Sequence, residues 1–388
     1  MPTLPWALLA AACLGMFAAS SSGTTRAPFL IEMARDLSAS LPMVANLMAA
    51  TSISWGVSSV FAGTASDRWG RRPFLVGGPL GLAACLVCLS LAQSFLGVAF
   101  WATVAGAFAG GFTGVIMTEA SARTADRQRG RALGWVMAGQ SLALLVGVPL
   151  AAWIGSSIGW RGVNRVVASV AVLAAIGLFV TTLRPPAGSA SGAQPARPSM
   201  RSAMTGPVLR LLSMGVAERV CYGLTVVYFA TFLQATYGLT PAGVAIPLGL
   251  VALGNILGTI IGGQAADRFA DRSHTFAMAM IGSGGAALVL FSWTPGLAGT
   301  VALGFAYATF SAMSRPSLMA ALANVPDEVR GTVLGLNVTA ASLGWLGAAT
   351  LGGWIMAEIG FIGFGPFAMA VALLGAVLAL TGRNHRAG

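Results

Sequence analysis

The residues best suited to chemistry in this chain are charged side chains inside otherwise apolar stretches. Glu218 and Arg219 are neighbours within one such stretch, and Tyr222 shares the helical face of Glu218 because residues four apart on a helix are adjacent. A carboxyl group in apolar surroundings can take up and release a proton, and a guanidinium can hold an anion or act as a counter-ion. We therefore expect Glu218 to bind a proton. The residues expected to contact a small-molecule substrate are Arg26, Arg219, Tyr222, Arg315 and Asn337.

A purely structural role is the alternative for these charges. Consecutive residues of a helix point about 100° apart, so Glu218 and Arg219 cannot both face one direction squarely. Glu218 could instead form a static ion pair with Arg315 or with Arg219. Burial favours the neutral form of the carboxyl group, whereas a nearby guanidinium favours the carboxylate. The sequence is compatible with both roles.

The elements that carry these charges are long apolar segments. Of 388 residues, 56% are hydrophobic and 9% are charged, against roughly 25% charged in soluble domains. About 20 apolar residues in a helix cross bilayer hydrocarbon, which is about 30 Å thick, and such long unbroken runs satisfy their backbone there as helices. The sequence predicts an all-α membrane protein with twelve transmembrane helices, at residues 5–30, 42–65, 73–92, 96–120, 131–155, 163–183, 207–235, 243–266, 274–293, 297–322, 332–357 and 360–381.

The chain divides into two similar halves. Residues 184–206 are rich in Pro, Gly, Ser and Ala and show no apolar periodicity, which is typical of a linker. They separate residues 1–183 from residues 207–388, and each half carries six predicted helices. After the second helix of each half, a glycine is followed four residues later by an aspartate, Asp67 in one half and Asp267 in the other. This repeat predicts two pseudo-symmetric six-helix bundles and makes transport the first functional hypothesis.

The basic residues predict an orientation in the membrane. The net charge is +11, and all 22 basic residues are arginines. In a twelve-helix arrangement most of them fall in loops on one side, and only Arg35, Arg161 and Arg165 lie in loops on the other. The positive-inside rule therefore places both termini in the cytoplasm, and the arginines mark topology rather than a nucleic-acid surface. The first basic residue is Arg26, so the chain begins without the charged region of a cleavable signal peptide.

No metal or cofactor site is expected. The four cysteines lie within predicted helices, where a thiol behaves as a small apolar group. Cys85 and Cys88 have the spacing of metal ligands, but their helix offers no second ligand pair. His274 and His385 are the two histidines, and they form no cluster. A membrane enzyme would need a nucleophile, base or metal at a water-facing helix end, and no such constellation is present in the sequence.

The segment Gly63–Arg72, with the sequence Gly-Thr-Ala-Ser-Asp-Arg-Trp-Gly-Arg-Arg, resembles the loop signature of the major facilitator superfamily. Gly263–Arg272 resembles a degenerate copy of it, and the resemblance covers essentially the whole chain. It implies the major facilitator fold with alternating access to a central site. The gating residues that it implies are Gly63, Asp67, Arg68, Gly70, Arg71, Arg72, Glu119, Asp267 and Arg268.

The resemblance also implies how this loop would act. Asp67 would latch the two halves at the cytoplasmic face by accepting hydrogen bonds at the start of the helix predicted at 332–357, where it also meets the positive dipole end. Arg71 or Arg68 would pair with Glu119, which closes the fourth predicted helix. The alternative is that these charges lie at the membrane interface and set topology alone.

Gly139, Gly147, Pro149 and Gly155 in the fifth predicted helix resemble the antiporter signature of the drug and sugar efflux branch of the superfamily. The proline would bend the helix, and the glycines would let it pack closely against the helix predicted at 243–266. An ordinary kinked packing helix is the alternative. The arginine common near the start of the fourth helix in proton antiporters of this superfamily has no counterpart in Phe100–Gly106, which leaves Glu218 as the only acid well inside a predicted helix.

The function predicted from the sequence is secondary active transport. We expect a monomeric exporter of a small organic molecule in a bacterial inner membrane, driven by proton exchange. An importer or uniporter of a small organic solute is the alternative within transport. A membrane-embedded enzyme or sensor is the alternative from another class, but twelve spans leave no room in the chain for a soluble sensing domain.

Overall fold

The computed structural model describes residues 4–125, 128–183, 204–269, 271–325 and 327–381, and every regular element in this part of the chain is helical. Eleven of the described helical stretches are long and apolar enough to cross a membrane. The structure divides into two compact units, α1 to α7 in one and α9 to α14 in the other. Most of the linker predicted at 184–206 lies outside the described residues.

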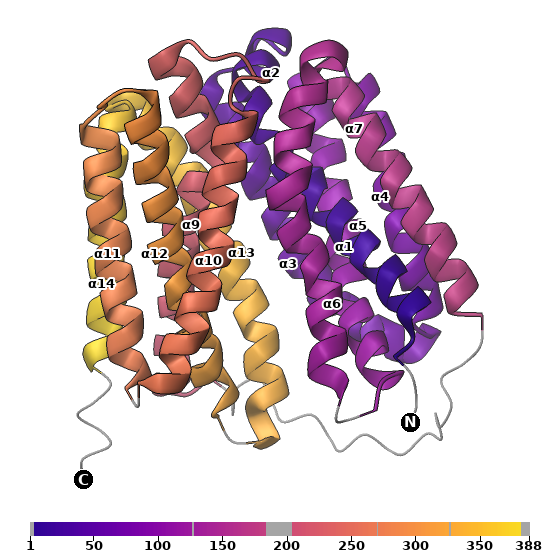
Figure 1. Cartoon of the computed structure of the whole chain (residues 1–388). Helices are drawn as coiled ribbons and strands as arrows, with labels where there is room; N and C mark the ends of the chain where they lie inside the picture. The colour runs from indigo at the N-terminus through magenta and orange to yellow at the C-terminus, as the bar shows by residue number, and fades with distance from the viewer. Residues whose placement is uncertain (1–3, 126–127, 184–203, 270, 326, 382–388) are drawn as a thin grey trace. The chain divides into compact units, whose positions relative to one another are not determined.

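The helices of the amino-terminal unit, coloured indigo to magenta in Figure 1, correspond to the first six predicted spans. Short polar signals set several of their ends: the Ser40 and Ser94 side chains accept hydrogen bonds from the backbone N–H groups of Met43 and Gly97 and cap α3 and α5. The elements are α1 (Trp6–Thr24), η1 (Ala27–Phe29), α2 (Leu30–Asp36), α3 (Leu41–Trp69), α4 (Arg72–Leu91), α5 (Phe95–Ala122), α6 (Arg129–Leu142), η3 (Ala143–Gly147) and α7 (Val148–Thr181).

The carboxyl-terminal unit, coloured salmon to yellow in Figure 1, repeats the pattern of long apolar helices. Asp271 caps α11, and Gly238 ends α9 in the left-handed conformation. Phe232, Phe291 and Phe364 pack edge to face within this unit, with ring centroids 5.1 to 5.3 Å apart. The elements are α9 (Gly206–Tyr237), α10 (Ala245–Arg268), α11 (Arg272–Ser292), α12 (Leu297–Ala323), α13 (Asp327–Glu358), η4 (Phe361–Gly363) and α14 (Phe364–Thr381).

The loop predicted between the fifth and sixth spans is reduced to one residue. The stretch Arg129–Thr181 is helical over 53 residues, which would extend about 80 Å if straight, far more than the roughly 30 Å of bilayer hydrocarbon. Gly159 interrupts α7 with φ 65° and ψ 173°, a conformation that only glycine adopts without strain. Figure 1 shows the chain reversing direction in this region, from α6 to the far end of α7. The sequence prediction of a longer loop at 156–162 was wrong, because one glycine suffices for the turn.

Glycines spaced four residues apart bring pairs of helices into close contact in each unit. In the first unit they lie on α5 and face α3, whose Ser54 and Ser58 hydroxyls donate to backbone carbonyls of α5 over 2.6 Å. In the second unit they lie on α10 and face α12. Small residues are favoured at such contacts because no hydrophobic force drives helices together in lipid. Association depends instead on van der Waals packing and hydrogen bonds, which need the backbones to approach closely. The glycines are Gly106, Gly110 and Gly114 in α5 and Gly254, Gly258 and Gly262 in α10.

Candidate functional site

A buried cluster of charges lies between α9 and α12 of the carboxyl-terminal unit. Glu218 on α9 is only 1% exposed. Its Oε1 atom accepts hydrogen bonds from Nη2 and Nε of Arg315 on α12, over 2.9 and 3.3 Å. Its Oε2 atom lies 3.4 Å from Nε of Arg219. The structure therefore brings together three of the residues singled out in the sequence, and Glu218 forms ion pairs with both Arg315 and Arg219.

Aromatic rings complete this cluster. The Tyr222 ring is buried, and the guanidinium carbons of Arg315 and Arg219 lie 5.0 and 5.9 Å from its centroid, within the range of cation–π interaction. Trp345 of α13 packs edge to face on Tyr222, with centroids 5.7 Å apart. The cluster carries two cations and one anion, so it has an excess positive charge. About a fifth of each arginine side chain remains exposed.

Asn337 of α13 lies against a different part of α9. Its Nδ2 atom lies 3.9 Å from the sulfur of Met319, and its side chain faces Gly215. Asn337 is two turns of α13 away from Trp345, about 12 Å along the helix. The structure therefore does not place Asn337 within the cluster, and its predicted contact with substrate remains a separate hypothesis.

Arg26 is a second buried cation, in the amino-terminal unit just after α1. It is 5% exposed, and its Nη1 atom donates to the Thr51 hydroxyl of α3 over 3.1 Å. Among the described residues, its Nε and Nη2 atoms have no hydrogen-bond partner. These two atoms form the edge of the guanidinium that binds a carboxylate or phosphate through two parallel hydrogen bonds. A buried guanidinium with that edge free is chemically suited to an anion, because an unpaired buried charge is costly.

The gating residues predicted from the loop signature are partly assembled. Glu119 at the end of α5 is buried and pairs with Arg71, whose Nη1 atom lies 3.2 Å from Oε2. Arg123 provides a second partner, with its Nε atom 2.5 Å from Oε1. Arg68 is exposed at the end of α3, so of the two arginines considered it is Arg71 that contacts Glu119. The structure contains the ion pair between Arg71 and Glu119, and its role in gating remains a prediction.

The structure also describes Gly63, Gly70 and Arg72 of the loop signature. Gly70 ends α3 with φ 81°, which explains a glycine at that position, whereas Gly63 lies in α3 with open space around its Cα. Arg72 at the start of α4 lies over the Phe179 ring, 4.7 Å from its centroid. The side chain of Asp67 lies outside the described part of the structure, as does that of Thr332 at the start of the helix predicted at 332–357, so the latch remains a prediction.

The second copy of the loop is differently built. Asp267 and Arg268 are exposed at the end of α10. Asp271 instead caps α11 by accepting hydrogen bonds from the backbone N–H groups of Ser273 and His274, over 3.0 and 3.3 Å. Partial burial alone would raise the pKa of Asp271, but the hydrogen bonds from His274 and Ser273 hold that pKa below its ordinary value.

Gly139 and Gly147 of the antiporter-like motif face α1, and Gly155 faces η1. A side chain at Gly139 would collide with the backbone of Cys13, and one at Gly155 with the ring of Phe29. Within the amino-terminal unit these glycines therefore permit close approach to α1 and η1. Their packing against the helix at 243–266 remains a prediction. Pro149 cannot donate to the carbonyl four residues earlier, and the five residues Ala143–Gly147 before it form a π-helical turn.

Sequence reasoning missed three partners of the predicted residues: Thr51, Arg123 and Trp345. Arg123 stands four residues after Glu119, a spacing that predicts an ion pair on one helix. Thr51 and Trp345 lie within apolar segments far from their partners along the chain, so no local pattern indicated them.

Comparison with known proteins agrees with this architecture. Residues 12–228 and 211–387 each match the family described as Major Facilitator Superfamily. The chain is 27% identical over 269 residues to the chloramphenicol resistance protein of Streptomyces lividans, covering 68% of this chain and 67% of that protein. It is 25% identical over 360 residues to the inner membrane transport protein YdhP of Escherichia coli O157:H7, covering 91% of this chain and 90% of that protein.

A solved structure shows the same fold. It is that of a bacterial homolog of the human lysosomal transporter Spinster, in an inward-facing and unoccupied conformation. The TM-score is 0.74 at 17% sequence identity, over 98% of this chain and 94% of that one. The family match covers nearly the whole sequence, and the long apolar helices agree with it. The chain belongs to the major facilitator superfamily and is a multi-pass membrane transporter.

Proposed function

We propose that this transporter exports a small organic molecule in exchange for protons. The observation that carries the proposal is the position of Glu218, which is almost fully buried between two arginines in a membrane-embedded cluster. Intramembrane charges are costly and mark substrate or proton pathways in transporters. The resistance function in the name of the Streptomyces lividans relative supports the direction of export.

Exchange requires that the proton and the substrate exclude each other. The Glu218 carboxylate can accept either a proton or a hydrogen bond from a substrate, and it cannot do both with the same lone pair. A substrate with a hydrogen-bond donor or a positive charge would therefore compete directly with the proton. Arg219, Arg315, Tyr222 and Arg26 would contact its other groups. Binding either ligand would bias the two access states differently, which is the thermodynamic requirement for coupling.

The excess positive charge of the cluster favours a second candidate function. Protonation of Glu218 would neutralise the anion that holds Arg315 and Arg219, and both guanidinium groups would then be free for an anionic substrate. Proton and anion would in that case bind together, which drives uptake rather than exchange. The free edge of Arg26 supports the same candidate. The charge of the substrate therefore distinguishes the two functions.

The proposed architecture is that of twelve crossings in two pseudo-symmetric six-helix bundles, residues 1–183 and 207–388. The break at Gly159 supports it, since it divides one over-long helical stretch into two crossings. The bundles would rock around a midplane site, with Asp67 latching the cytoplasmic face in one of the two states. The protein would act as a monomer in a bacterial inner membrane, with both termini in the cytoplasm.

The experiment is transport in vesicles of both orientations. Inverted and right-side-out vesicles receive cationic, uncharged and anionic compounds, with and without an imposed pH gradient. We expect uphill accumulation of a cationic or uncharged compound in inverted vesicles with an acidic interior. Accumulation of an anion only, in right-side-out vesicles with an acidic exterior, would replace export with proton-linked uptake. Equal rates with and without the gradient would refute proton coupling in either form.

A further inference from the structure

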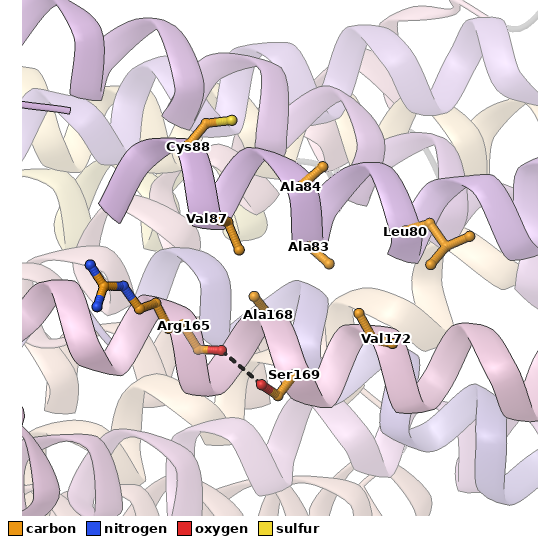
Figure 2. Close-up of a pocket in the computed structure, with 9 residues that line it drawn as sticks. All are labelled: Leu80, Ala83, Ala84, Val87, Cys88, Arg165, Ala168, Ser169 and Val172. Atoms are coloured by element: carbon orange, nitrogen blue, oxygen red, sulfur yellow. Dashed lines mark hydrogen bonds between the residues drawn. The ribbon is translucent and has the colours of Figure 1, made fainter. Parts of the chain in front are cut away.

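A groove outside the charged cluster lies between α4 and the second part of α7. It has a volume of about 640 Å³, and Figure 2 shows its lining along the two helices. Ala83 and Ala84 of α4 and Ala168 and Ser169 of α7 line its middle, and these small side chains are what leave the space. Of its nine lining residues only Arg165 is charged.

The length of the groove matches one leaflet of a bilayer. Leu80 and Val172 lie at one end, and Arg165 lies at the other (Figure 2). Ser90, near the carboxyl end of α4, contacts Arg165 and so marks the same end. From Leu80 to Cys88, the last α4 residue that lines the groove, the helix rises about 12 Å, which is comparable to half of a hydrocarbon layer about 30 Å thick. The groove thus extends from a membrane interface to about the bilayer midplane.

The surroundings of the groove are suited to lipid. Leu80 and Val87 on its α4 side are 45% and 42% exposed, and Leu173 and Ile176 beside it on α7 are 60% and 55% exposed. Large apolar side chains with such exposure on a transmembrane protein meet acyl chains. An occupant of this groove must therefore be apolar along most of its length.

Arg165 gives the groove a polar end of defined charge. Its side chain is exposed, and its Nε atom donates to the Ser90 hydroxyl over 3.1 Å, which fixes the orientation of the guanidinium. Among the described residues, the Nη1 and Nη2 atoms have no partner, and no carboxylate lies within ion-pair distance of Arg165. A guanidinium held in this way binds the oxygens of a phosphate well.

We propose that this groove binds one anionic phospholipid, with its phosphate on Arg165 and an acyl chain lying over Ala83, Ala84 and Ala168. The lipid comes from the leaflet that borders Ser90 and Arg165. In the orientation proposed above, this is the leaflet away from the cytoplasm. The site is separate from the Glu218 cluster and does not depend on the direction of transport.

The test measures lipid bound to the purified full-length protein. The protein in detergent is titrated with phosphatidylglycerol or phosphatidylcholine of identical acyl chains, and bound lipid is counted by native mass spectrometry. We expect the wild type to bind phosphatidylglycerol about fivefold more tightly, the factor expected for one basic residue at an anionic interface. Arg165→Gln should abolish this preference. Ser169→Leu, which fills the groove, should reduce binding of both lipids.

Two matched control variants remove a positive charge or enlarge a side chain at positions away from the groove. Arg131→Gln removes an exposed arginine at the start of α6, and Ala10→Leu enlarges an exposed residue of α1; both should retain the wild-type preference. Inorganic phosphate at millimolar concentration should not displace the lipid, because it lacks the acyl chain. A headgroup preference that persists in Arg165→Gln, or lipid binding that is unchanged in Ser169→Leu, would overturn the proposal. Absence of bound lipid in the wild type would overturn it as well.

Discussion

Two nitrogen atoms on one edge of the Arg315 guanidinium, Nε and Nη2, donate to a single oxygen atom of Glu218, over 3.3 and 2.9 Å. The contact joins α12 to α9 in a buried part of the carboxyl-terminal unit. Charge-assisted hydrogen bonds of this kind are roughly twice as strong as neutral ones. Protonation of Glu218 would remove the negative charge of the acceptor and so weaken the contact between the two helices. Proton occupancy and helix packing are thus linked through one pair of residues.

The first prediction concerns the number of crossings. Single cysteines are placed at a position within 190–200 and at Ser156. They should be labelled from opposite sides of the membrane, because one crossing, the part of α7 after Gly159, separates the two sites along the chain. The measurement is reaction with a membrane-impermeant maleimide in a variant that lacks the native cysteines. Labelling of both sites from the same side would contradict the twelve-crossing arrangement.

The second prediction concerns the latch. Asp67→Asn should insert normally and abolish or strongly slow turnover, because an uncharged amide loses the attraction to a helix amino terminus that stabilises one access state. Asp267→Asn should be milder, since its loop lacks the second glycine and the paired arginines. Initial transport rates are compared at equal amounts of membrane protein. A wild-type rate for Asp67→Asn would remove the gating role.

The third prediction concerns the ion pairs at the end of α5. Glu119→Gln leaves two cations, Arg71 and Arg123, without their buried partner and should cost about 3–5 kcal/mol of stability. Arg71→Gln keeps the pair between Arg123 and Glu119, so it should lower stability much less. Thermal unfolding in detergent measures the difference. Equal melting temperatures for the two variants would contradict the prediction that Glu119 stabilises the protein as the shared partner of Arg71 and Arg123.

The fourth prediction follows from the lowered pKa of Asp271. A carboxyl group with a lower pKa in the folded state stabilises the fold at pH values above its unfolded pKa, and this stabilisation is lost as the pH falls through the folded value. Asp271→Ala should therefore destabilise the protein by about 1 kcal/mol near pH 7, the usual value of a helix cap. The difference should begin to shrink near pH 4, about the ordinary pKa of aspartate, and be lost as the pH falls through the lower folded value. A difference independent of pH would contradict the capping role of the charge.

The sequence predicted the long helices well, since each is an apolar run of bilayer length and the ends are marked by residues such as Ser94 and Asp271. It also indicated Glu218, Arg219 and Arg315, because a charge within an apolar run is conspicuous. The sequence prediction was wrong around Gly159. It left a loop of several residues between the spans at 131–155 and 163–183, whereas in the structure a single glycine turns the chain. It also missed Thr51 and Trp345, because contacts between helices distant in sequence leave no periodic signal in either one.

The central claim is that Glu218 exchanges a proton during transport, and Glu218→Gln tests it most directly. The variant keeps the size of the side chain and its acceptor oxygen but cannot titrate. Glu358→Gln, at the exposed end of α13, is the matched control and should behave as wild type. Uphill transport under a pH gradient and substrate binding are measured for both variants in the same vesicles. We predict that Glu218→Gln binds substrate but no longer accumulates it against a gradient. Accumulation by Glu218→Gln with the pH dependence of the wild type would contradict the claim and leave Glu218 a structural partner of Arg315.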